Sequence, residues 1–188
     1  MSEPVSESTF EPKRPLLHGE HVDLRAIEEA DYPALHRWAN DPAMVGDYDI
    51  LRPVSLDDIR RRYRDTRALT AEGGALLIVR KDGAPVGTVS CHPVSYGVYS
   101  PAFNIGIEIE PEQRGQGYGS EAQRLFADYL LATFPVGRVE ASTDSENISE
   151  QRALERAGFT REGVARSAAW RGERWHDMVV YSRVHGDR

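Results

Sequence analysis

The sequence predicts an α/β fold in which helices cover both faces of one mixed sheet. Segments with the alternating apolar pattern of strands are interspersed with segments that have the three-four spacing of amphipathic helices. A chain of 188 residues has the usual size of one domain, and we predict a single domain over residues 16–188. Apolar residues make up 40% of the chain and charged residues 28%, which is typical of a globular protein with a sizeable core.

Residues 1–15 are rich in Ser, Pro and Glu and contain few large apolar side chains, so we predict a flexible N-terminal tail. This segment lacks the apolar middle of a signal peptide, and no apolar run approaches the roughly 20 residues of a membrane-spanning helix. These features favour a cytoplasmic protein without a membrane partner. Cys91 is the only cysteine, so no intrachain disulfide can form, and we expect Cys91 in the core.

The chain then begins with a strand and two helices. His21–Ala26 alternates apolar and polar residues, and the next segment has helical spacing until Asn40–Pro42 stops it. Pro42–Pro53 lacks periodicity, so we predict a long loop there, and such loops often contact substrate. Ser55 can cap the following helix. Carboxylates flank the arginines of this helix, which predicts a solvated face formed by Arg60, Arg61, Arg62 and Arg64.

A three-stranded meander and a long helix follow. Ala75–Arg80 and Pro85–His92 are apolar runs joined by Lys81–Ala84, which has strong hairpin chemistry. Ala102–Glu110 extends this sheet. From about Gly117 to Thr133 apolar residues repeat at helical spacing, so this helix needs a sheet face to pack on.

The last part of the chain adds a strand, a helix and two more strands. We predict a strand over Arg138–Thr143 and a helix over Ser149–Ala157 that ends at Gly158. Two strands, Phe159–Ala168 and Trp175–Val184, complete the sheet.

A glycine-rich turn between a strand and the long helix is the most informative stretch. Gly115, Gly117 and Gly119 remove side chains where the chain enters the helix, so backbone N–H groups can converge on an anion. This arrangement predicts a pyrophosphate site, although the glycine spacing alone fits a ligand-free tight turn equally well. No Lys follows as in a P-loop, and the third glycine comes one residue too early for the dinucleotide fingerprint. These differences argue against ATP and NAD.

The same turn resembles motif A of the GNAT acetyltransferases. The R/Q-x-x-G-x-G/A pattern of that motif is met by Arg114, Gly117 and Gly119. Downstream, Asn147–Phe159 (NISEQRALERAGF) is similar to the family's Asn-containing loop, helix and Gly-Phe ending. The RWANDP segment and Trp170–Asp177 are similar to the RimJ/RimL-like branch. The resemblance covers roughly residues 16–184.

The resemblance implies a GNAT fold and acetyl-CoA as co-substrate. The GNAT fold is a mixed, mostly antiparallel seven-stranded sheet that splays apart after the third meander strand, where the thioester enters. Main-chain groups of Ile107, Glu108 and Ile109 are then expected to pair with the pantetheine arm and to polarise the acetyl carbonyl. The other residues that the resemblance places at acetyl-CoA are Arg114, Gly115, Gln116, Gly117, Tyr118, Gly119, Ser120, Asn147 and Arg152.

The implied reaction is direct transfer of an acetyl group to a primary amine in a ternary complex. The acceptor can be a peptide N-terminus, an antibiotic, a polyamine or a small metabolite, and the RimJ/RimL-like branch is compatible with a homodimer. A non-catalytic acyl-CoA-binding domain is the alternative from another class, because side chains that the family often uses are missing. The formal net charge of -7 argues against nucleic acid and suits a cationic acceptor.

Catalysis requires a group that takes a proton from the amine. Glu108 is the leading candidate because its strand borders the thioester, and a surface carboxylate on the sheet is an equally supported alternative. The family's usual Tyr is replaced by Leu154, and the branch's usual Ser is replaced by Glu150. Ser149, one place earlier, is therefore the second catalytic candidate, and Glu150 or a water chain on the Asn147 loop are the alternatives to it. Ala169 stands where that branch can carry a catalytic Glu.

Three residues are expected to contact the acceptor: Tyr48 and Asp49 in the predicted loop, and Trp170. Three further aromatic residues, Trp38, Trp175 and Tyr96, could also line an acceptor pocket, and packing in the core or at its rim is the alternative for most of these five aromatic residues. The histidines are scattered without metal-ligand spacing, so no metal site is predicted. His176 and Asp177 are neighbours in a strand and point to opposite faces, so we do not expect them to form a dyad.

Overall fold

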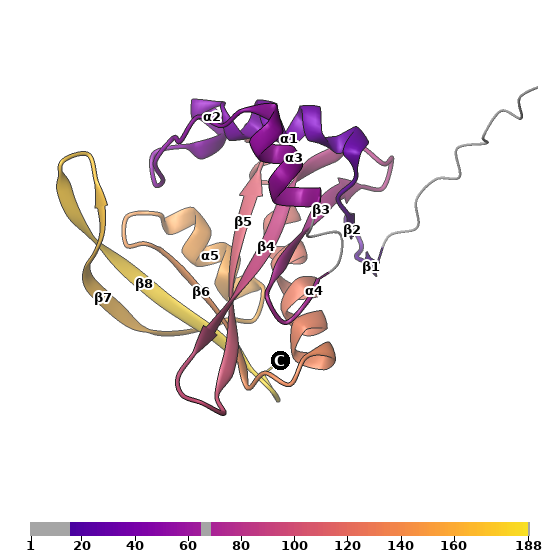
Figure 1. The fold of residues 1–188 in the computed structure, drawn as a ribbon. Helices are drawn as coiled ribbons and strands as arrows, with labels where there is room; N and C mark the ends of the chain where they lie inside the picture. Colours follow the sequence, from indigo (N-terminus) through magenta and orange to yellow (C-terminus); the bar gives the residue numbers. More distant parts are fainter. Residues whose placement is uncertain (1–15, 65–68, 188) are drawn as a thin grey trace, which may run out of the picture.

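The computed structural model describes residues 16–64 and 69–187, which form one eight-stranded sheet with helices on both faces (Figure 1). The predicted tail, residues 1–15, lies outside the described residues. The strand order is β1-β2-β3-β4-β5-β6-β8-β7, and among these strands only β5 and β6 pair in parallel.

The strands are β1 (Leu17–His18), β2 (Val22–Ala26), β3 (Gly74–Arg80), β4 (Pro85–Ser95), β5 (Pro101–Ile109), β6 (Arg138–Asp144), β7 (Thr160–Arg171) and β8 (Arg174–Val184). The helices are α1 (Tyr32–Ala39), α2 (Pro42–Val45), α3 (Leu56–Arg64), α4 (Tyr118–Thr133) and α5 (Ile148–Arg156), with 3-10 turns η1 (Glu29–Asp31) and η2 (Pro111–Gln113). The sequence of elements confirms the predicted α/β fold.

Two details differ from the prediction. The sheet has eight strands rather than seven, because the two-residue strand β1 pairs with β2 and places Leu17 opposite Leu24. The predicted loop after Asp41 begins with the one-turn helix α2. The side chain of Asp41 accepts a hydrogen bond from the amide of Ala43 at 2.9 Å, and Pro42 occupies the first helical position, which tolerates its missing N–H.

Strands β5 and β6 pair over a short length and then separate. Their parallel register joins Phe103 to Val139 and Asn104 to Glu140. Beyond Asn104 and Glu140 the two strands no longer pair with each other, although β5 continues to Ile109 and β6 continues to Asp144. One edge of β5 is therefore left with unpaired backbone groups, which confirms the expected splay of the sheet.

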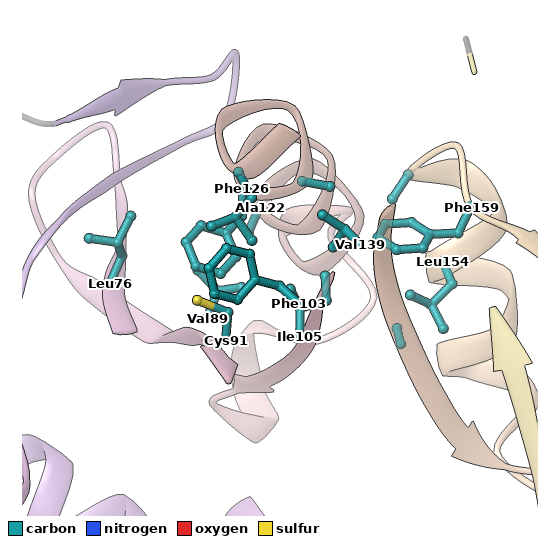
Figure 2. Packing of buried hydrophobic residues seen from close by; sticks show 14 of the residues in the cluster. Leu76, Val89, Cys91, Phe103, Ile105, Ala122, Phe126, Val139, Leu154 and Phe159 are labelled. Atoms are coloured by element: carbon teal, nitrogen blue, oxygen red, sulfur yellow. The ribbon is translucent and has the colours of Figure 1, made fainter. Parts of the chain in front are cut away.

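Separate hydrophobic cores lie on the two faces of the sheet. Helices α4 and α5 cover one face, where Phe103, Phe126, Leu154 and Phe159 are buried together (Figure 2). Cys91 lies in this core as predicted, and burial raises the pKa of its thiol to about 12, which leaves it unsuited to act as a nucleophile. Helices α1, α2 and α3 cover the other face, close to one end of β3–β5 (Figure 1).

Candidate active site

The glycine turn, residues 114–120, has the backbone geometry of an anion site. Gly115 and Gly117 have φ angles of 77° and 85°, a left-handed conformation that side chains disfavour. Gly117 is the N-terminal cap of α4 and provides no side-chain hydrogen bond to it. The first amide groups of α4 and the positive end of its dipole are thus directed at the turn. A phosphate group can bind there, in the first turn formed by Tyr118, Gly119 and Ser120.

The side chains of this turn bind the protein itself. Arg114 donates from Nε to the carbonyl of Ile109 at 2.9 Å and from Nη2 to the carbonyl of Met44 at 2.7 Å. Gln116 donates from Nε2 to the carbonyl of Glu112 at 3.3 Å. The guanidinium of Arg114 therefore anchors the turn to β5 and to α2, and the backbone amides remain the groups that face an anion.

Strand β5 leads into the glycine turn and directs side chains to both faces of the sheet. The side chains of Ile107 and Ile109 lie against the start of α4, since a Cβ placed on Gly119 would be 3.6 Å from Ile107 and 3.7 Å from Ile109. Glu108 lies between them and points to the opposite face, as alternation along a strand requires. The main-chain groups of Ile107 and the amide of Ile109 face the open edge of β5 and suit the polar groups of an extended ligand, whereas the carbonyl of Ile109 already accepts from Arg114.

Glu108 lines a cavity of about 480 Å³ between the sheet and helices α1 and α3. Thr88 on β4 lies opposite it and donates from Oγ1 to Glu108 Oε2 at 3.4 Å. Glu108 is exposed to solvent at the open cavity, but the surrounding walls partly desolvate its carboxyl group. This desolvation raises the pKa of Glu108. The Thr88 hydrogen bond and Arg62 oppose the increase, whereas the carboxylate of Asp49 adds to it.

The cavity wall is acidic and partly aromatic. Besides Glu108 it includes Asp49 and Glu72, with Trp38 and Tyr63 among the aromatic residues. Burial, followed by the charge of Glu108, raises the pKa of Tyr63, so its hydroxyl stays protonated and can donate. The other lining residues are Leu35, Ala39, Ile59, Arg62, Gly74, Ala75, Thr88, Ser90, Cys91, Gly106 and Ile107. Arg62 thus borders the cavity, whereas the sequence predicted only a solvated face for it.

The start of α5 forms the other side of the splay. Asn147 caps this helix, with Oδ1 accepting from the amide of Glu150 at 3.2 Å and from Ser149 Oγ at 2.8 Å. The exposed hydroxyl of Ser149 therefore already donates to Asn147. Arg152 lies on the exposed side of the same helix.

Glu150 is a titratable residue that the sequence named only as a candidate after Glu108. Burial raises the pKa of its carboxyl group to about 7, and the nearby amide of Gln123 on α4 opposes part of this increase. Gln123 is itself almost fully buried, and its Nε2 has no described acceptor within hydrogen-bonding distance. The place of Glu150 three residues after Asn147 was evident from the sequence, but the burial of its side chain arises only because α4 packs against α5.

The predicted acceptor residues fall in different places. Asp49 lines the cavity, whereas Tyr48 and Trp170 are not among its lining residues. Trp170 packs edge-on against Trp175 at a centroid distance of 5.4 Å, in the β7–β8 hairpin, and is 52% exposed. Tyr48 donates from its hydroxyl to the carbonyl of Glu146 at 3.2 Å.

His176 and Asp177 have separate partners, as expected from their opposite faces. Asp177 accepts from the amide of Ser167 at 2.8 Å, and His176 lies 3.3 Å from Asp144. Asp144, Glu146 and His176 can bring three ligand atoms within 4.8 Å of one another. The guanidinium of Arg171 lies 2.7 Å from Asp144 and already neutralises this carboxylate, so we assign no metal to the cluster.

Comparison with known proteins identifies the family. Residues 21–160 match the family model described as the acetyltransferase (GNAT) domain. The chain belongs to this family, as the resemblance implied, and its members use acetyl-CoA as the acyl donor. The probable N-acetyltransferase YjcK from Bacillus subtilis is 32% identical over 111 residues, which cover 59% of this chain and 61% of YjcK. The match to YjcK therefore spans about three fifths of that protein's length.

Solved structures confirm the fold. Ribosomal-protein-S5-alanine acetyltransferase from Vibrio fischeri superposes with a TM-score of 0.78 at 19% identity, covering 90% of this chain and 96% of that protein. Spermidine N-acetyltransferase from Vibrio cholerae, solved in complex with CoA and spermine, superposes with a TM-score of 0.77 at 18% identity, covering 90% and 98%. No helix in the described part of the chain is long and apolar enough to span a membrane.

Proposed function

We propose that this protein transfers an acetyl group from acetyl-CoA to a primary amine while both substrates are bound. The observation that carries the proposal is that two different sites meet at β5. Its unpaired edge and the glycine turn suit acetyl-CoA, and the acidic cavity that contains Glu108 lies on the opposite face of the same residues. An amine in the cavity can thus reach a thioester that lies along the strand.

In the proposed mechanism Glu108 removes a proton from the attacking amine. The amine nitrogen bonds to the thioester carbonyl carbon, while a backbone amide of β5 stabilises the developing negative charge on oxygen. The carbon–sulfur bond then breaks, and its electron pair stays on sulfur. The raised pKa of Glu108 brings it closer to that of an amine and makes it a better base than a carboxylate with an ordinary pKa.

Glu150 is our choice for the group that gives a proton to the departing sulfur. It is half-buried in the first turn of α5, which follows β6 on the other side of the splay. With a pKa of about 7, a large fraction of its carboxyl groups carries a proton near neutral pH. Ser149 remains the other candidate, although its hydroxyl donates to Asn147.

For the acceptor we propose a cationic amine, either a small molecule or a protein N-terminus. Asp49, Glu72 and Glu108 give the cavity a negative potential that attracts cations. The names of relatives agree with amines of this kind, since one is a spermidine N-acetyltransferase and another acts on the alanine of a ribosomal protein. A homodimer and a cytoplasmic location stay predictions from the sequence.

A panel of amines tests the proposal. Purified protein is mixed with acetyl-CoA and, in turn, spermidine, kanamycin and a peptide with an N-terminal alanine, and the release of CoA thiol is followed together with the mass of each amine. We expect thiol and acetylated amine in equal amounts with at least one acceptor. Binding of acetyl-CoA without thiol release above the amine-free background, for every acceptor, would instead support the non-catalytic acyl-CoA-binding domain.

A further inference from the structure

Arg171 joins three segments that are far apart in the sequence. It is the last residue of β7, and its side chain is only 15% exposed. Its Nη2 donates to Asp144 Oδ2 at 2.7 Å, at the end of β6, and its Nη1 donates to the main-chain carbonyl of Tyr48 at 3.2 Å. One planar guanidinium thereby connects the β7–β8 hairpin and β6 with residues 46–51, a segment that we name the acceptor loop.

Further contacts hold Tyr48 in the same place. The guanidinium of Arg171 lies 5.7 Å from the centre of the Tyr48 ring, within the range of a cation–π interaction. The Tyr48 hydroxyl donates to the carbonyl of Glu146 at 3.2 Å. Arg171 thus holds the main chain of Tyr48, and Glu146, next to the cap of α5, holds its side chain.

His176 and Asp144 fix the orientation of Arg171. Because arginine only donates, the contact of 3.0 Å between Arg171 Nη2 and His176 Nδ1 makes this nitrogen the acceptor. The opposite ring nitrogen, Nε2, then carries the hydrogen and donates to the carbonyl of Arg171 at 3.1 Å. Asp144 is buried, which alone would raise its pKa, but the amide of Glu146 and the Arg171 guanidinium hold the pKa below its usual value. Asp144 is thus a stable anion for Arg171.

The residue that follows Tyr48 reaches the acidic cavity. Asp49 lines this cavity and is close enough to Glu108 for its charge to raise the pKa of Glu108. Asp49 is exposed, and its side chain makes a local hydrogen bond, in which Oδ1 accepts from the amide of Ile50 at 2.7 Å. The position of its carboxylate hence depends on where the main chain of Tyr48 is held.

We propose that Arg171 is a positioning residue for the acceptor amine: by holding the Tyr48 carbonyl it keeps Asp49 on the wall of the cavity that contains Glu108. The proposal rests on the proposed acetyl transfer. Arg171 does not line the cavity, and it acts through the acceptor loop. The cation that Asp49 attracts should consequently bind more weakly when Arg171 is lost, whereas acetyl-CoA, on the other side of β5, should bind as before.

The test compares Arg171→Met and Arg171→Lys with Arg174→Met. Arg174 lies in the same hairpin and makes an exposed ion pair with Glu146 at 3.3 Å, so its loss is a matched control that leaves the acceptor loop in place. With the best amine of the panel, we expect Arg171→Met to raise the acceptor KM about tenfold, the usual effect of losing one charged hydrogen bond. Arg171→Lys keeps the charge but not the planar fork, so its KM should lie between those of the wild type and Arg171→Met. The Kd of acetyl-CoA should be unchanged in all three variants.

Hydrogen exchange of the acceptor loop supplies a readout that needs no acceptor. Its amides should exchange faster in Arg171→Met than in the wild type and Arg174→Met, while those of α4 keep their protection. An unchanged acceptor KM, unchanged exchange in residues 46–51, or an equal weakening of acetyl-CoA binding would overturn the positioning role. If the wild type acetylates no amine, the proposed function fails, and the exchange rates still decide whether Arg171 orders the loop.

Discussion

Replacement of Gly117 by Val separates cofactor binding from fold stability, because the chain contains a nearly identical control position. Gly117 and Gly83 both have a φ of 85°, and a Cβ placed on either glycine has no atom within 4 Å. Gly83 lies in the β3–β4 turn, far along the chain from the glycine turn. The same substitution at both positions hence introduces similar backbone strain, and the added Cβ has room at both.

The strain of a side chain in this conformation is about 1–3 kcal/mol. For a domain of this size that corresponds to a decrease in Tm of roughly 2–12 °C, and we expect a similar decrease in Gly117→Val and Gly83→Val. Only Gly117→Val places atoms where a phosphate must approach the first amides of α4. Loss of one hydrogen bond to a charged phosphate weakens binding by about 1.5–3 kcal/mol, or roughly 10- to 100-fold in Kd.

Isothermal titration of the two folded variants with acetyl-CoA measures this difference. Gly83→Val should keep the wild-type Kd, and Gly117→Val should bind at least tenfold more weakly. Equal Kd values for both variants would show that the open turn at Gly117 is a ligand-free turn, and the phosphate site would have to be placed elsewhere.

Two carboxyl groups lead to further predictions. Glu108→Gln should lower the rate of amine acetylation near neutral pH and leave the Kd of acetyl-CoA unchanged. Part of the lost rate should return at higher pH, where more of the amine is already deprotonated. A pH–rate profile identical to that of the wild type would exclude Glu108 as the base. Glu150→Gln should slow acetylation, whereas Glu155→Gln, an exposed substitution on the same helix, should not. Because the folded pKa of Glu150 is raised to about 7, this group binds more protons in the folded state than in the unfolded state from about pH 4.5 to 7, and its contribution to wild-type stability decreases across this range. Glu150→Gln should lose that part of the decrease in urea titrations at several pH values, and a pH dependence identical to that of the wild type would refute the raised pKa.

The features that the sequence could predict are those that depend on local pattern. The left-handed turn at Gly117 and the direction of Glu108 both follow from residues a few places away, through glycine spacing and strand alternation. The splay beyond Asn104 followed from the family resemblance, and the strand register confirms it.

The features that the sequence did not predict depend on packing between distant segments. Tyr63 and Arg62 border the cavity only because α3 crosses the sheet near Glu108. Trp170 is one of the aromatic residues that suggested acceptor binding, yet it packs on Trp175. Its neighbour Arg171 instead contacts Tyr48, more than a hundred residues away in the sequence. No local pattern distinguishes such an arginine from a solvated one.

Thermal denaturation with and without acetyl-CoA decides whether the glycine turn and the open edge of β5 form the binding site. A ligand that binds only the folded state at about 100 times its Kd adds about 2.7 kcal/mol to the free energy of unfolding. For a domain of this size we expect acetyl-CoA to raise Tm by roughly 5–11 °C, and ATP or NADH at the same concentration to raise it much less. An unchanged Tm at saturating acetyl-CoA, or an equal shift with ATP and NADH, is incompatible with an acetyl-CoA site at this turn.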